Sequence, residues 1–194
     1  MKKVFGVLIF GIGLITVGCK EENIETQKTE DQIVHNSVDL TLNDDSEEIV
    51  QIPFDNDLKF KFFITNLKDH NSNNNWDESN TDTLAACLQT NYVEILDNSE
   101  HGYLDALRKD FVIGQNSGNW AQRFEPNNYV LSTSFGVGEF KGSGDKYLGF
   151  RLEKGSGYIY GWFLVNCSEK SDHLEIKEYA YNKTAGNSIK AGQE

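Results

Sequence analysis

Two runs near the C-terminal end alternate strictly, and this alternation constrains the fold more than any other feature of the chain. In Tyr147–Leu152, one face carries Leu148, Phe150 and Leu152. In Tyr158–Cys167, one face carries Ile159, Phe163, Val165 and Cys167, and the other carries Tyr158, Tyr160, Trp162 and Leu164. Successive side chains of a strand point to opposite faces. The second run therefore predicts a central strand that is covered on both sides.

Further strand signals extend this pattern through the chain. Turn residues at 155–157 and 168–172 join the two runs to a third, His173–Tyr181, which predicts an antiparallel meander. Upstream, alternation or β-prone composition marks Leu58–Ile64, Leu84–Leu88, Tyr92–Leu96 and Tyr129–Thr133. Helical spacing occurs in Tyr103–Phe111, through Leu104, Leu107 and Phe111, and predicts a short helix or a turn between strands. We expect an all-β fold, an antiparallel β-sandwich of jelly-roll-like type with at most one short helix, and a barrel as the alternative.

The N-terminus has the features of an export signal. Lys2 and Lys3 precede an uncharged apolar run, Val4–Val17, which is too short to span a bilayer as a stable helix. Gly18-Cys19 closes the run and resembles the lipobox of bacterial lipoproteins. The resemblance implies that the signal peptide is residues 1–18 and that Cys19 becomes the acylated N-terminus, carrying palmitate or a similar chain. Residues 19–37 are then a flexible acidic tether, and residues 38–194 form a single domain.

Three charged residues follow the cysteine directly. Lys20, Glu21 and Glu22 resemble the export signal that sends lipoproteins of Bacteroidota to the outer face of the outer membrane. The resemblance implies a lipid-anchored, surface-exposed protein of the outer membrane. The other interpretation is a solvated charged linker.

The charge of the chain excludes one class of partner. The full sequence has a net charge of −12, and loss of Lys2 and Lys3 with the signal takes it to −14. A protein of that sign repels phosphate backbones, so we expect no nucleic-acid partner. Membrane association should come from the acyl chains, because anionic lipid surfaces are repelled as well.

The C-terminal half carries a second resemblance. It contains a YLGF segment from Tyr147, a YGW segment from Tyr160 and a YAYN segment from Tyr179. This pattern resembles a group of mostly uncharacterised secreted bacterial β-sandwich proteins. The resemblance supports the fold and brings no catalytic residues with it.

An asparagine-rich loop is the best candidate for a metal site. Oxygen side chains stand at alternating positions, Asp69, Asn71, Asn73 and Asp77. That spacing resembles calcium loops of the DxDxDGxxD type, in which alternate residues aim oxygens at one hard cation. Asn74 stands in place of the turn glycine, and only two ligands carry a formal charge, so a weak site is expected. The alternative is a plain polar loop.

Other candidate residues are scattered along the chain. Trp76 and Trp120 lie in polar loops, where they could stack on a sugar ring, whereas Trp162 is expected in the core. Thr83, in Asp82-Thr83-Leu84, matches the short sequence on which Bacteroidota O-glycosylate exported proteins. Cys87 and Cys167 are the cysteines left after export, and they are either a disulfide or free thiols.

No catalytic residues are predicted. The sequence has no G-x-S-x-G elbow and no H-E-x-x-H, and its histidines are isolated. We therefore expect a cell-surface lipoprotein with a non-enzymatic binding or structural module, whose partner beyond the membrane is a glycan or another surface protein. No cofactor is expected other than calcium. The alternative is a glycan-acting hydrolase or a calcium-assisted carbohydrate-binding module, because carboxylates distant in sequence can meet in space.

Overall fold

The computed structural model describes residues 32–44, 46–52, 58–67, 83–98, 103–121, 127–136 and 138–194. Within these ranges the protein is all-β, with antiparallel sheets and no helix, which confirms the predicted β-sandwich. The described strands belong to the compact unit Asp31–Glu194. Among the described residues there is also no helix long and apolar enough to cross a membrane.

Sheet A has seven strands and contains the predicted meander. Six of them lie in the order β1-β12-β11-β10-β5-β6, and β8 pairs with β5. Their bounds are β1 Ile33–Asn43, β5 Val93–Asn98, β6 Tyr103–Leu104, β8 Asn119–Ala121, β10 Asp145–Lys154, β11 Gly157–Cys167 and β12 His173–Asn182. The hairpin β10–β11 is in register along its whole length, so Arg151 lies opposite Tyr160.

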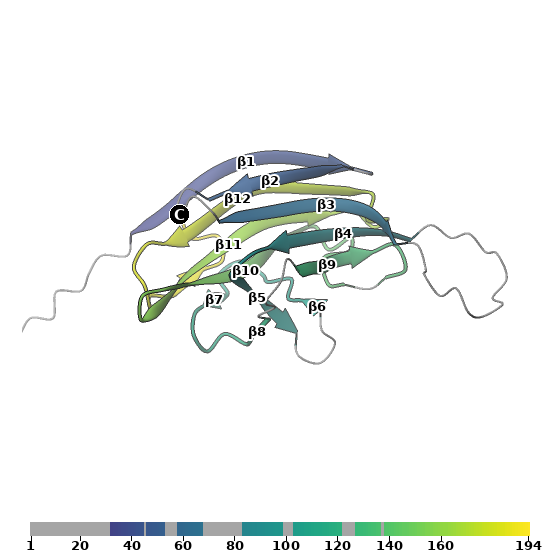
Figure 1. Cartoon of the computed structure of the whole chain (residues 1–194). Helices are drawn as coiled ribbons and strands as arrows, with labels where there is room; N and C mark the ends of the chain where they lie inside the picture. The colour runs from purple at the N-terminus through teal and green to yellow at the C-terminus, as the bar shows by residue number, and fades with distance from the viewer. Residues whose placement is uncertain are drawn as a thin grey trace, which may run out of the picture. The chain divides into compact units, whose positions relative to one another are not determined.

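Sheet B has four strands in the order β2-β3-β4-β9. Their bounds are β2 Glu47–Gln51, β3 Lys59–Leu67, β4 Thr83–Thr90 and β9 Asn127–Thr133. A short pair, β7 Val112–Ile113 with β13 Ile189–Lys190, forms a third sheet. In Figure 1 the long strands of sheets A and B overlie one another, and the short strands β6, β7 and β8 lie together below them.

Two apolar clusters cover the two faces of sheet A. The first lies between the sheets and holds apolar side chains of β3, β10, β11 and β12, with rings such as Phe60, Phe150 and Phe163 in mutual contact. The second lies on the opposite face of sheet A and includes Tyr160, Trp162 and Ile189. Both faces of β11 are therefore buried, as its sequence predicted, and Trp162 is fully buried.

Of the two alternatives predicted for 103–111, a short helix or a turn between strands, the helix does not form. Residues 103–111 contain the short strand β6, and Leu107 exchanges both backbone hydrogen bonds with Tyr147. Leu104 packs between the sheets, whereas Leu107 belongs to the cluster on the other face of sheet A. The apolar spacing therefore reflects residues divided between two cores, not one stripe of a helix.

The domain begins earlier than residue 38. Strand β1 starts at Ile33, and Ile33 to Ser37 pair in register with Asn182 to Glu178 of β12. His35, Asn36 and Ser37 are polar, as in a tether, but Ile33 and Val34 are apolar, and β12 supplies backbone partners that composition does not reveal. Positions 33–37 of the expected tether are thus part of sheet A.

Candidate functional site

Several predicted site residues lie outside the described ranges. They are Cys19, Lys20, Glu21 and Glu22 of the export signal, the loop residues Asp69, Asn71, Asn73 and Asp77, and Trp76. Thr83 is the first residue of β4. Trp120 lies in β8 and is partly buried. The predictions of lipidation, calcium binding and glycosylation at these positions stay predictions.

An arginine–carboxylate pair lies on the outer face of sheet A, away from sheet B. Arg151 of β10 is directly opposite Glu94 of β5 in the strand register. Its Nε donates to Oε2 of Glu94 at 2.6 Å, and its Nη2 forms an ion pair with the same oxygen. The two side chains are 15% and 9% exposed, so this pair is largely withdrawn from water. A buried carboxylate requires such a partner.

Two aromatic rings lie against the guanidinium. The Cζ atom of Arg151 lies 4.1 Å from the ring centroid of Tyr158 and 4.6 Å from that of Trp120. Tyr160 extends this group, because its ring lies 5.9 Å from Trp120 and 6.3 Å from Tyr158. A cation over an aromatic face gains electrostatic energy that increases as water is excluded. The arginine is therefore fixed in position before any ligand arrives.

A groove of about 400 Å³ opens beside this pair, where β5 and the β10–β11 hairpin meet. It is lined by Tyr92, Glu94, Leu152, Glu153 and Gly155. Tyr92 is 87% exposed, and Glu153 is exposed as well. This volume falls in the range of small-molecule sites, and the lining combines one aromatic ring with two carboxylates.

The two carboxylates that line the groove differ in whether a positive charge neutralises them. Arg151 contacts Oε2 of Glu94 through Nε and Nη2, and Oε1 takes no hydrogen bond from the described part of the protein. Burial raises the pKa of the Tyr160 hydroxyl, while the nearby Arg151 opposes that rise. The groove therefore presents two carboxylates, of which Arg151 neutralises one.

A second group of carboxylates lies around β6. Burial, followed by the charges of Glu139 and Asp97, raises the pKa of Asp105 to about 6. Glu139 also accepts a hydrogen bond from the backbone N–H of Ala106 at 3.1 Å. A carboxyl with such a pKa can serve as a general acid, but none of the three lines the groove.

The two cysteines do not form a disulfide. Both are buried free thiols. On β4, Ala86 and Leu88 face the core between the sheets, so Cys87 projects from the opposite face, whereas Cys167 lies within that core. Cβ atoms that point to different faces do not meet the geometry of a disulfide. Cys167 instead contacts Ser132, with Sγ 2.8 Å from Oγ.

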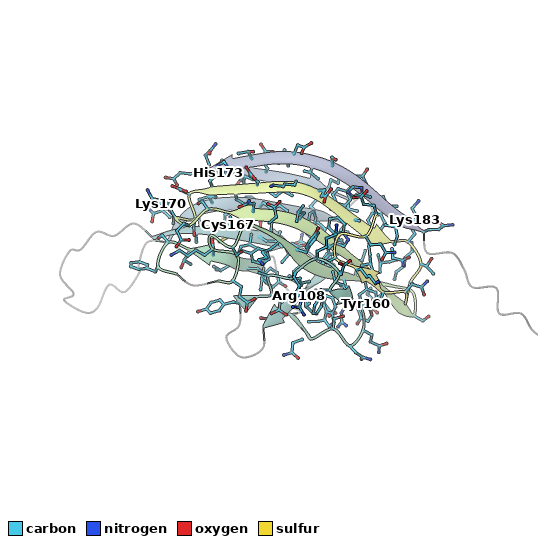
Figure 2. All side chains as sticks on the ribbon, turned by 180° about the vertical axis from the view of Figure 1, so that it is seen from behind. Arg108, Tyr160, Cys167, Lys170, His173 and Lys183 are labelled. Carbon is cyan, nitrogen blue, oxygen red and sulfur yellow. The ribbon has the colours of Figure 1, made fainter. Side chains whose placement is uncertain are left out.

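Cys167 and the groove lie at opposite ends of β11. Cys167 is the last residue of the strand, and Gly155, which lines the groove, comes just before its first residue. Figure 2 shows Cys167 and Tyr160 toward opposite ends of the strand. Burial raises the pKa of Cys87 to about 11 and also raises that of Cys167, which makes both thiols poor nucleophiles at neutral pH. The cysteines therefore serve packing and not the chemistry of the groove.

No cluster of three or more His, Cys, Asp or Glu side chains suited to a metal ion occurs among the described residues. The candidate calcium loop lies outside them. The groove itself offers two carboxylates, which is fewer oxygen ligands than calcium takes in proteins.

The sequence revealed Trp120 as a candidate but not Tyr92, Glu94, Arg151 or Glu153. One signal was present: Arg151 is the only charged residue in Tyr147–Leu152. Its partner Glu94 lies 57 positions away, and Trp120 arrives on a third strand. Strand pairing is what brings them together.

Comparison with known proteins assigns no relative to the chain. No protein-family model matches it, and no curated protein and no solved structure is significantly similar. The function is therefore argued from the groove and its surroundings.

Proposed function

We propose that this protein is a lipid-anchored surface protein of a bacterial outer membrane whose β-sandwich domain binds a saccharide and is not an enzyme. The observation that carries the binding function is the groove beside the Arg151–Glu94 pair, with the exposed ring of Tyr92 among its lining residues. The apolar C–H face of a sugar packs against an aromatic ring, and its hydroxyls hydrogen-bond to carboxylates. A groove lined by an aromatic ring and carboxylates suits such a ligand.

The fixed geometry around Arg151 supports recognition. The guanidinium contacts Trp120 and Tyr158 and is bonded to Glu94, so the Glu94 side chain that lines the groove is held in place. Preorganised groups lose less conformational entropy on binding, which favours affinity. Trp120 then contacts Arg151 and does not line the groove, and Tyr92 offers the exposed ring surface.

A glycan array tests the binding function directly. The mature protein, residues 19–194 in detergent, is expected to retain a limited set of glycans, and Tyr92→Ala should lose them. A matched control is Phe135→Ala, which removes another exposed ring, 66% exposed, from a turn outside the groove. An array on which wild type binds nothing would overturn the proposal.

The anchor has its own test. Mass spectrometry of the membrane-extracted protein is expected to find acylated Cys19 and no residues 1–18, and Cys19→Ala should leave an uncleaved or released chain. Replacing Lys20, Glu21 and Glu22 by Ala should leave the protein in the membrane but shielded from protease added to whole cells. Undiminished cleavage of that variant would mean that these residues do not direct surface display.

A glycan hydrolase is the second candidate, because Glu94 and Glu153 both line the groove and such enzymes use a pair of carboxyls. Arg151 already occupies Oε2 of Glu94, which leaves that residue one oxygen for chemistry. Release of reducing ends from bound glycans, abolished in Glu94→Gln and in Glu153→Gln, would favour the enzyme. Retained, uncleaved glycan favours the binding module.

A further inference from the structure

Tyr92 has a backbone conformation that its side chain does not favour. Its φ is 60°, in the left-handed region where glycine and asparagine are preferred. The residue lies in the short turn between β4 and β5, and its ring is 87% exposed, so folding gains little from it. A strained and exposed aromatic residue that lines a groove indicates a role in binding.

The carboxylates beside Tyr92 carry an uncompensated charge. Glu94 is paired with Arg151, but the exposed Glu153 has no ion pair within the part of the chain that the structure describes. Glu153 lies opposite Tyr158 in the β10–β11 register, two residues along from Arg151. With one arginine for two glutamates, the groove is negative, and so is the protein as a whole. Charge complementarity therefore favours a ligand that carries a positive charge.

Two features of the groove favour a positively charged sugar over a simple cation. The Tyr92 ring offers a flat apolar surface that suits a pyranose ring, and it also attracts an ammonium group that lies over its face. The remaining Oε1 of Glu94 and the carboxylate of Glu153 can both accept N–H hydrogen bonds. Charge-assisted hydrogen bonds of this kind are stronger than those between neutral partners.

We propose that the groove binds a hexosamine with a free amino group, with its protonated amine directed at Glu94 and Glu153 and its ring packed on Tyr92. This inference rests on the proposed function, because it names the saccharide class that the same groove takes. Gly155 leaves room for the ring, since a Cβ built there would meet no atom within 4 Å. Anionic glycans are disfavoured by the same charges.

Three hexasaccharides with one β-1,4-linked backbone test the amine: glucosamine hexamer, its N-acetylated form and cellohexaose, which carry an amine, an acetamide and a hydroxyl at the same carbon. Calorimetry on the mature protein in detergent at pH 6 is expected to give at least tenfold tighter binding of the glucosamine hexamer, weakening as salt rises. Tyr92→Ala should lose binding, and Glu153→Gln should lose most of the tenfold preference. Glu48→Gln on β2, an exposed glutamate outside the groove, is the matched control.

The outcomes separate this inference from the proposed function. Equal or tighter binding of the neutral hexamers, still lost in Tyr92→Ala, would overturn the amine and leave the saccharide module standing. Equal binding of a lysine hexapeptide would also overturn the inference, because it would show a cation site without sugar recognition. Absence of binding to all three hexamers overturns the inference, and absence of binding across the full glycan array overturns both.

Discussion

Arg151 and Glu94 face each other across β10 and β5, and both nitrogen contacts of the guanidinium fall on the same carboxylate oxygen. Trp120 and Tyr158 lie against the guanidinium, so aromatic rings as well as Glu94 hold Arg151. This relationship joins the stability of sheet A to the shape of the groove. Replacing either partner should therefore affect both folding and binding.

We expect Glu94→Ala to lower the free energy of unfolding by about 2–4 kcal/mol, because it leaves a largely buried guanidinium without its partner. Arg151→Ala should have a similar effect, and the double variant should cost less than the two singles together, as a double-mutant cycle measures. Asp145→Ala, which breaks the exposed pair with Lys177, is the control and should cost less than about 1 kcal/mol. Additive effects of the two single variants would contradict an energetic coupling.

Phe163 tests the predicted core. It is fully buried and lies within 5.4 Å, between ring centroids, of Phe60, Phe62 and Phe150. Phe163→Ala should lower the free energy of unfolding by about 3–5 kcal/mol, through lost apolar burial and the cavity left behind. Denaturant unfolding measures this loss. A change below about 1 kcal/mol would mean that the side chain is not packed as the structure has it.

Sequence alternation was enough to predict the meander of β10, β11 and β12, because a strand buried on both faces needs apolar residues on both. The helical spacing of 103–111 left a short helix or a turn open, and the sequence pattern did not reveal that Leu104 and Leu107 belong to different cores. It also could not place Glu94 beside Arg151, since that contact depends on which strands become neighbours in the sheet. Burial shows in the local sequence, whereas strand order depends on the whole chain.

Gly161 is a position where the core leaves no room for a side chain. A Cβ built there would lie 2.2 Å from Cζ of Phe150 and 2.7 Å from the carbonyl oxygen of Ala180. Gly161→Ala should therefore lower the free energy of unfolding by about 1–3 kcal/mol through overpacking. Gly157→Ala, on the same strand, is the matched control, because its nearest neighbours are 3.5 Å away. Equal stabilities of the two variants in denaturant unfolding would contradict the close packing of β11 on β10.

Asp105 should make stability depend on pH. Its pKa is raised from 3.8 to about 6 in the folded protein, so the fold favours the protonated form. Below pH 3.8, Asp105 is protonated in both the folded and the unfolded protein, so it does not lower the free energy of unfolding. As pH rises through 6, its ionisation is less favourable in the folded protein, and the free energy of unfolding falls. Asp105→Asn should stabilise the protein at pH 7.5 by about 1 kcal/mol, after allowance for solvent screening, and have little effect at pH 3.5. Thermal unfolding at both pH values measures this, and an equal gain at both would contradict the raised pKa.

Calcium binding by the asparagine loop is a prediction from sequence alone. Alternating oxygen side chains at Asp69, Asn71, Asn73 and Asp77, in an acidic protein, favour a hard cation. With two formal charges, the dissociation constant should be about 0.1–1 mM, the range of extracellular calcium modules. At a calcium concentration ten times that constant, the stabilisation by mass action is about 1.4 kcal/mol.

The melting temperature of the mature protein should therefore rise by roughly 3–6 °C in 10 mM calcium. The variant Asp69→Ala plus Asp77→Ala should show no rise, because both carboxylates are gone. Magnesium serves as a matched salt control, since it demands stricter geometry and keeps its water ligands. Wild-type melting temperatures that agree in calcium and in chelator would leave this segment as a polar loop, and saccharide binding would then have to be explained by the groove without a metal ion.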